Sequence, residues 1–556
     1  MRQGSDESRC PVALVAVACE HRTTLDAPRY LGRMFASVCS VLALLTGGDV
    51  AAAQERTPAP VLVLVVARPA EDLEFAQAVD AAVRFHGAAL LEAGAAPSRE
   101  LLPALREFAP RRVLVFVPAA QFDAGLHRRV FALARAVDDD PFVDFEFGYM
   151  TASDGPALLA LWRRTEAFHA SGPRSARWNE VMVATGIESL VYGNHVPRLA
   201  ELAGFSGDGV CLGVVESDPN VLAFAARELV RLDGSAVVSF TGNGDPQGVW
   251  LFDGRRNLDR DAHWDYAPDR VGSDPDGVMP RLLAADVRRR DLSGAVVWSG
   301  TCHSAVTRRA VVEGDIVSTF GRTSGRVIHE LPPDESLCLA FQGAGAVALL
   351  APVGANHGFA VDVEQDFALR HGATLGAVIA STWDDVVLAA NGSPRLADPF
   401  DAVEGEDEDV MAAGGANRVL IGDPTLAPFR AVADSRERVV VTRDGNTLVV
   451  DVAWEAGFEP RAWDMYGDDR ARDGRITARV EVVCGAASLE IANAAVSVAD
   501  ESGATLPFVL GPCLVEDEPG FAVLHLCARA ARESIGTRAL RARFTLELAH
   551  DSVRER

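Results

Sequence analysis

The sequence predicts an α/β fold with a mostly parallel sheet, followed by an all-β sandwich at the carboxyl end of the chain. Between Pro60 and Phe429, short apolar runs typical of buried strands alternate with helical patterns. Apolar strands that alternate with helices form parallel sheets covered on both faces. After Phe429 the pattern changes to short runs of alternating apolar and polar residues, with a turn signal at Asp444-Gly445. Such runs are typical of antiparallel strands in a sandwich.

The α/β part divides into two sets of elements. In the first set, the helical patterns cover Leu73 to Leu91 and Gly125 to Val137, and a linker is expected from Ser171 to Trp178. The strands expected in this set are Val61 to Ala67, Arg111 to Ala119 and Phe142 to Met150. Those expected in the second set are Glu180 to Gly186, Val210 to Ser217, Ala236 to Gly242, Ala295 to Gly300, Ala346 to Gly354 and Arg418 to Pro424.

Composition excludes several classes of function. The net charge is −25 and the apolar fraction is 49%. A nucleic-acid-binding protein would need a basic surface, so no nucleic-acid partner is expected. The chain contains no lysine, which excludes a P-loop lysine, a pyridoxal Schiff base and a Ser-Lys pair. The base for any nucleophile must therefore be a histidine, a carboxylate or a second thiolate.

The first 54 residues predict a leader that is removed on export. Arg29 and Arg33 precede the apolar stretch Met34 to Leu45, which is too short to span a bilayer, and Ala51 to Ala53 offer small residues for cleavage. We therefore expect a secreted, periplasmic or cell-surface protein without a membrane span in the mature chain. A chance apolar stretch is the alternative interpretation.

Metal and disulfide signals are weak. The chain has no CxxC pair and no zinc-finger spacing, so no cofactor is expected. The segment from Phe252 to Asp269 is rich in Asp and Arg and includes His263, which leaves a structural calcium loop possible, although it lacks the regular spacing of an EF-hand. Cys484, Cys513 and Cys527 could form a disulfide in an exported protein, and the sequence does not pair them.

Cys302 is the candidate nucleophile, because it comes just after a buried-strand pattern, where ligands of parallel sheets bind. A nucleophile elbow would need glycine two residues later, and Ser304 stands there. An inert core thiol is the other local interpretation. The triplet Gly242-Asn243-Gly244 could open a dinucleotide site, but Gln247 stands where a third glycine is required.

The wider set of motifs resembles the gingipain-type cysteine peptidases, which have a caspase-like fold. The motifs, from about Val61 to Phe429, are "DFEFGYMTA", "VVSFTGNGDPQGVW", "VVWSGTC", "GAGAVALLAPVGANHG", "GATLGAVIA" and "VLIGDPTLAPF". The resemblance implies an amino-terminal α/β subdomain at 60–176 and a catalytic-type subdomain at 177–429. An immunoglobulin-like sandwich at 430–556 would follow. The partner would be a protein or peptide substrate.

The resemblance also assigns roles to particular residues. Cys302 would be the nucleophile, and the N–H groups of Gly244 and Cys302 would hold the oxyanion. The family places its catalytic histidine in Gly-His-Gly, and Asn243 stands in that position here. Asparagine has no titratable proton, so the base would have to be another residue; His195 and His357 are the candidates. Two functions follow from these observations: a cysteine endopeptidase, or a catalytically impaired module that acts as a binding or surface protein.

Overall fold

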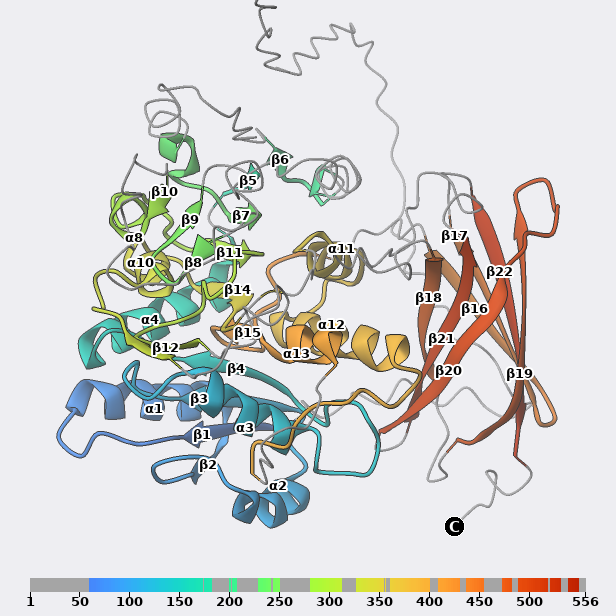
Figure 1. Cartoon of the computed structure of the whole chain (residues 1–556), viewed down its shortest axis with the longest axis horizontal. Helices are drawn as coiled ribbons and strands as arrows, with labels where there is room; N and C mark the ends of the chain where they lie inside the picture. The colour runs from blue at the N-terminus through green and yellow to red at the C-terminus, as the bar shows by residue number, and fades with distance from the viewer. Residues whose placement is uncertain are drawn as a thin grey trace, which may run out of the picture. The chain divides into compact units, whose positions relative to one another are not determined.

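The computed structural model describes most of the chain after residue 59 (Figure 1). The described residues are 60–173, 175–182, 200–201, 203–207, 229–241, 244–250, 281–312, 327–354, 356, 361–400, 409–430, 437–454, 473–482, 489–518, 521–531 and 539–549. Within them, no helix combines the length and the apolar character needed to cross a bilayer.

A ten-stranded sheet forms the centre of the α/β part, in the order β2-β1-β3-β4-β15-β14-β11-β7-β5-β6. Strands from both predicted sets of elements belong to this one sheet. Their bounds are β1 Val61–Val65, β2 Ala89–Glu92, β3 Arg112–Phe116, β4 Glu146–Met150, β5 Arg177–Met182, β6 Ser206–Gly207, β7 Val237–Thr241, β11 Val296–Ser299, β14 Ala348–Pro352 and β15 Arg418–Ile421.

The sheet is mostly parallel, as the alternation of strands and helices predicts. Strands β5, β7, β11 and β14 pair in parallel, as do β1, β2, β3 and β4. The exception is β15, which pairs antiparallel with β14 and meets β4 at Ile421 and Tyr149. Strand β5 pairs with β7, so the first and third strands expected in the second set lie side by side.

Both faces of the sheet are buried, which explains why its strands are continuously apolar. In β11, the side chain of Val297 belongs to one core cluster, whereas Val296 and Trp298 belong to the cluster on the other face. The rings of Trp298, Trp178 and Phe429 pack against one another in this second cluster. Helices account for this burial; the longer ones are α1 Leu73–His86, α2 Leu102–Phe108, α3 Ala124–Ala134, α4 Gly155–Ser171, α10 Leu337–Gly343, α11 Val361–His371, α12 Leu375–Ala389 and α13 Val410–Ala416.

The structure corrects the expected bounds of one helix and of the linker. The helix expected from Leu73 to Leu91 ends at His86, because Gly87 adopts a left-handed conformation (φ 60°) and closes it. Leu90 and Leu91 then belong to β2 rather than to the helix. The expected linker from Ser171 is also shorter, since Ser171 is the last residue of α4.

The carboxyl-terminal part is the expected sandwich of antiparallel strands. A four-stranded sheet has the order β16-β17-β22-β19, and a three-stranded sheet has the order β18-β21-β20. Alternate residues of β17 and β22 are buried, in a core shared with β18 and β21. The turn signal at Asp444-Gly445 closes the β16–β17 hairpin. The strands are β16 Glu437–Asp444, β17 Thr447–Trp454, β18 Asp473–Val482, β19 Ile491–Asp500, β20 Val509–Glu518, β21 Phe521–Ala531 and β22 Leu540–Leu548.

The cysteines of the sandwich do not form the disulfide that an exported protein allows. Neither Cys513 nor Cys527 takes part in a disulfide, and Cys484 lies outside the described residues. Burial raises the pKa of Cys513 to about 11, so this thiol stays protonated at neutral pH.

Candidate functional site

Cys302 lies at the carboxyl edge of the sheet, three residues beyond the end of β11 at Ser299. Because β7, β11 and β14 run parallel, the segments that follow these strands leave the sheet at the same edge. The sequence-based position of Cys302 is therefore confirmed. Its chemistry depends on what the turn and the neighbouring segments place around the sulfur.

The turn that carries Cys302 is fixed by backbone hydrogen bonds to the end of β14. The N–H of His303 donates to the carbonyl of Gly354 at 2.8 Å, and the N–H of Ala305 donates to that of Pro352 at 3.0 Å. The hydroxyl of Ser304 donates to the carbonyl of Thr301 at 2.7 Å. His303 has a φ of 58°, a left-handed conformation that is uncommon for a non-glycine residue. Such strain persists where surrounding contacts impose it.

The thiol of Cys302 accepts a backbone hydrogen bond from the next segment of the site. The N–H of Asn356 lies 3.3 Å from the sulfur, and the side-chain amide of Asn356 donates to the carbonyl of Gly300 at 2.6 Å. Burial raises the pKa of the Cys302 thiol above its usual range, and the N–H groups of Asn356 and of Cys302 itself offset this only in part. The sulfur is therefore a protonated thiol at neutral pH unless a base removes its proton.

Gly244 lies directly against the residue that precedes Cys302. It is the first residue of β8 (Gly244–Asp245), which pairs with β9 (Gly248–Trp250). A Cβ atom at Gly244 would lie 2.2 Å from Cγ2 of Thr301 and 2.5 Å from the carbonyl oxygen of Gly248. Only glycine allows the backbone to approach the Cys302 turn this closely.

Replacing Gly244 by alanine is expected to destabilise this edge of the sheet. The new methyl group would overlap Thr301 and a backbone carbonyl that cannot rotate away, so β8 must shift. Overpacking of this kind costs about 1–3 kcal/mol in the free energy of unfolding, which urea denaturation measures. Gly343→Ala is the matched control, because the nearest atom to its Cβ would be Nη1 of Arg288 at 3.3 Å, with no backbone atom in the way. Equal stability of the two variants would contradict the close packing of Gly244.

A buried ion pair between Arg418 and Glu364 stabilises the end of β11. Arg418, the first residue of β15, donates from Nη1 to the carbonyl of Ser299 at 2.6 Å. Its Nε and Nη2 atoms donate to the two carboxylate oxygens of Glu364 at 2.7 and 2.6 Å. The side chains of Arg418 and Glu364 are only 1% and 2% exposed. This two-pronged geometry fixes the guanidinium, and with it the last residue of the strand before Cys302.

The remaining predicted site residues are not placed. Asn243, His195 and His357 lie outside the described residues, as does the Asp-rich segment from Phe252 to Asp269. The site therefore brings together Cys302 and Gly244 from the predicted set. It adds Asn356, the neighbour of His357 in the "GANHG" motif, which sequence reasoning overlooked because a backbone donor leaves no signal in the sequence.

Comparisons with known proteins give structural similarities at low identity. No family model matches the sequence, and no curated protein matches it. A crystal structure titled as the Arg-specific cysteine proteinase gingipain R (RgpB) has a TM-score of 0.40 and 12% identity, covering 85% of this chain and 92% of its own. A complex of Porphyromonas gingivalis RgpB pro- and mature domains has a TM-score of 0.41 and 11% identity, with 84% and 93% covered. A structure titled "Structure of Protease" has a TM-score of 0.37 and 10% identity, with 87% and 96% covered. The fold class follows from this chain's own strand order.

Proposed function

We propose that this chain is an exported, gingipain-like cysteine endopeptidase in which Cys302 is the nucleophile. The observation that carries the proposal is the juxtaposition at the carboxyl edge of the sheet. There the thiol that follows β11 is held by the N–H of Asn356, and the backbone of Gly244 packs against the residue before it. A nucleophile beside backbone N–H groups is the arrangement that acyl transfer requires.

The reaction would proceed through a thioester. A base takes the proton of the Cys302 thiol, and the thiolate forms a bond to the carbonyl carbon of the scissile peptide. The N–H groups of Gly244 and Cys302 stabilise the negative oxygen of the tetrahedral intermediate. The intermediate collapses, the C–N bond breaks, and the amine leaves with the proton from the base. Water then attacks the thioester, which releases a carboxylic acid and restores the thiol.

We propose a catalytic base that lies outside the described residues. A thiol with a raised pKa gives little thiolate at neutral pH, so a base strongly increases the rate. Asn243 cannot accept this proton, and His195 and His357 are the imidazoles that we propose for the role, with Asn243 as a positioning residue. Both histidines come after strands of the same part of the sheet in the sequence.

A catalytically impaired module is the second candidate function. Burial of Cys302, which raises the pKa of the thiol, together with asparagine in place of the family's histidine, favours it. Such a module would keep the backbone arrangement around Cys302 and bind peptides without cleaving them.

Cleavage of a peptide library by purified protein separates the two functions. We expect slow cleavage by the wild-type chain, loss of cleavage to background in Cys302→Ala, and loss in either His195→Ala or His357→Ala. Cleavage that survives Cys302→Ala would remove Cys302 from the mechanism. Peptide binding without cleavage, retained in Cys302→Ala, would establish the impaired module instead.

A further inference from the structure

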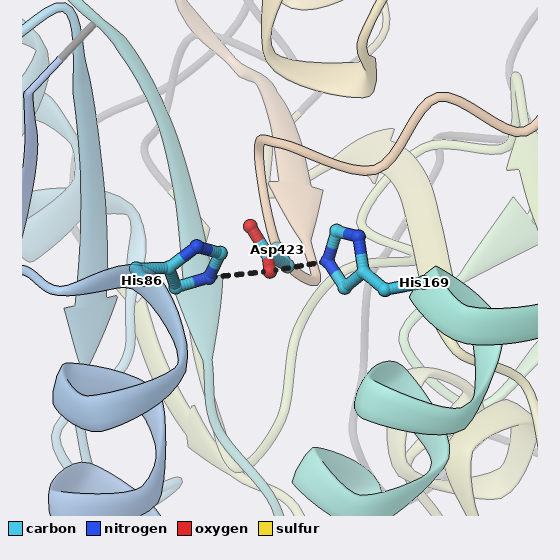
Figure 2. A group of neighbouring side chains, drawn as sticks. All are labelled: His86, His169 and Asp423. Atoms are coloured by element: carbon cyan, nitrogen blue, oxygen red, sulfur yellow. Dashed lines mark hydrogen bonds and ion pairs between the residues drawn. The ribbon is translucent and has the colours of Figure 1, made fainter. Parts of the chain in front are cut away.

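Three ligand-type side chains from distant parts of the sequence meet in a second cluster. His86 is the last residue of α1, His169 lies in the last turn of α4, and Asp423 follows β15 in the "GDPTL" motif. Figure 2 shows both imidazole rings directed at the Asp423 carboxylate from opposite sides.

This cluster is separate from the Cys302 site. Gly422, which precedes Asp423, packs against Ala348, the first residue of β14. Cys302 instead follows the last residue of β11, which runs parallel to β14. The two sites therefore lie at opposite edges of the sheet, and the proposed peptidase chemistry leaves this cluster unexplained.

The donor atoms converge on one point. Nε2 of His86 and Nε2 of His169 each lie 2.9 Å from the same carboxylate oxygen, Oδ2 of Asp423. The other oxygen, Oδ1, accepts hydrogen bonds from the N–H and the hydroxyl of Thr425 at 2.9 and 2.8 Å. The side chain of Asp423 is fully buried, and those of His86 and His169 are 8% and 20% exposed. Thr425 thus orients the carboxylate, while Oδ2 faces the two imidazoles.

The surroundings favour a positive charge at this point. Both histidines lie in the last turn of a helix, and the carboxyl ends of α1 and α4 approach the cluster together (Figure 2). The carboxyl end of a helix carries partial negative charge and stabilises cations.

We propose that His86, His169 and Asp423 bind a zinc ion through the two Nε2 atoms and Oδ2, with water as the fourth ligand. Imidazole nitrogens and a carboxylate oxygen are ordinary zinc ligands, at about 2.0–2.2 Å from the metal. A tetrahedron with such bonds separates its ligand atoms by roughly 3.3 Å, so each pair now at 2.9 Å needs to open by only about 0.4 Å. A neutral imidazole with its proton on Nδ1 offers the lone pair of Nε2 for this bond.

The zinc would join three elements between which the described residues show no backbone hydrogen bond at this point. It would tie the ends of α1 and α4, on one half of the sheet, to the segment after β15. The sandwich offers a useful contrast: His525 lies 2.8 Å from Glu516, but Arg479 lies 3.5 Å from the same carboxylate oxygen. A guanidinium already neutralises that pair and would repel a metal ion.

Zinc binding by the full chain, stripped with chelator and dialysed, tests the proposal. Titration with ZnCl₂, followed calorimetrically and by thermal denaturation, is expected to show one binding event that raises the Tm of the wild type. His86→Gln and His169→Gln are expected to lose that event and the rise in Tm. His371→Gln is the matched control, since His371 also lies in the last turn of a helix and is exposed. Cys302→Ala should also keep the event, which separates this proposal from the peptidase.

Cobalt substitution keeps the proposal falsifiable if the histidine variants fail to fold. The wild-type chain loaded with Co²⁺ is expected to show the visible absorption of a tetrahedral nitrogen and oxygen site. An intense thiolate-to-cobalt band would place the metal on cysteine and overturn the proposal. Identical zinc binding by the wild type and His169→Gln, or no rise in the wild-type Tm with micromolar zinc, would overturn it as well.

Discussion

Asn243→His is expected to raise the rate of peptide cleavage by about 10²- to 10⁴-fold, the usual contribution of a well-placed general acid–base. The reason is the state of the thiol: burial raises the pKa of Cys302, so the wild-type site holds little thiolate at neutral pH. Residue 243 immediately precedes Gly244, which packs against the Cys302 turn. An imidazole there would both remove the thiol proton and return it to the leaving amine. The measurement is kcat/KM on the best peptide of the library.

Two controls show whether a gain in cleavage rate comes from an imidazole at residue 243 that acts together with Cys302. Asn493→His adds a histidine at an exposed position in the sandwich and should leave the rate unchanged. The double variant Asn243→His with Cys302→Ala should return to background. A folded Asn243→His protein with no gain would contradict the expectation that an imidazole at residue 243 is a better base than His195 or His357. A fast wild-type enzyme that Asn243→His does not improve would contradict the same expectation, because His195 or His357 would then already be an efficient base.

Arg418→Met is expected to lower the free energy of unfolding by about 3–5 kcal/mol, the usual cost of breaking a buried ion pair from one side. The substitution leaves the Glu364 carboxylate buried without its guanidinium and removes the hydrogen bond to the Ser299 carbonyl. Since Ser299 ends the strand that leads to Cys302, the reactivity of the thiol should change together with stability. Urea denaturation measures the first effect, and the rate of alkylation of Cys302 measures the second.

The controls use an exposed pair and a double substitution. Arg395→Met breaks the pair with Asp409, in which the arginine side chain is 69% exposed, and exposed pairs contribute little. Replacing both partners, Arg418→Met with Glu364→Leu, is expected to recover much of the loss, because apolar residues of similar volume often substitute for a buried pair. A single Arg418→Met variant as stable as Arg395→Met would contradict the structural role of this pair.

The sequence predicts the parts of this fold that depend on local patterns. Burial on both faces of the sheet produces the continuous apolar runs of β1, β3, β7, β11 and β14. Burial on one face produces the alternation of apolar and polar residues along β17 and β22. Both patterns can be recognised within a short stretch of the sequence. The end of α1 was missed because the pattern of apolar residues continues through Gly87 into β2. There a single left-handed glycine outweighs the periodicity that surrounds it.

The positions of site residues can be predicted from the sequence only where a residue comes directly after a recognisable strand. Cys302 could be placed at the sheet edge because it follows an apolar run. Arg418 and Glu364 are 54 residues apart, and His86 and Asp423 are 337 residues apart. Contacts of this range are set by the strand order and by β15, which runs antiparallel to β14. No local pattern in a single sequence specifies them.

Covalent labelling with a peptidyl thiol-reactive probe tests the central claim, that Cys302 is the nucleophile of a peptide-processing site. The full chain is incubated at neutral pH with the peptidyl probe or with its non-peptidyl counterpart, and the modified residue is mapped by mass spectrometry. We predict a single adduct on Cys302, faster with the peptidyl probe, faster again in Asn243→His, and absent in Cys302→Ala. Labelling of Cys302 at the same slow rate by both probes, or no labelling of the folded chain in either form, would contradict the account.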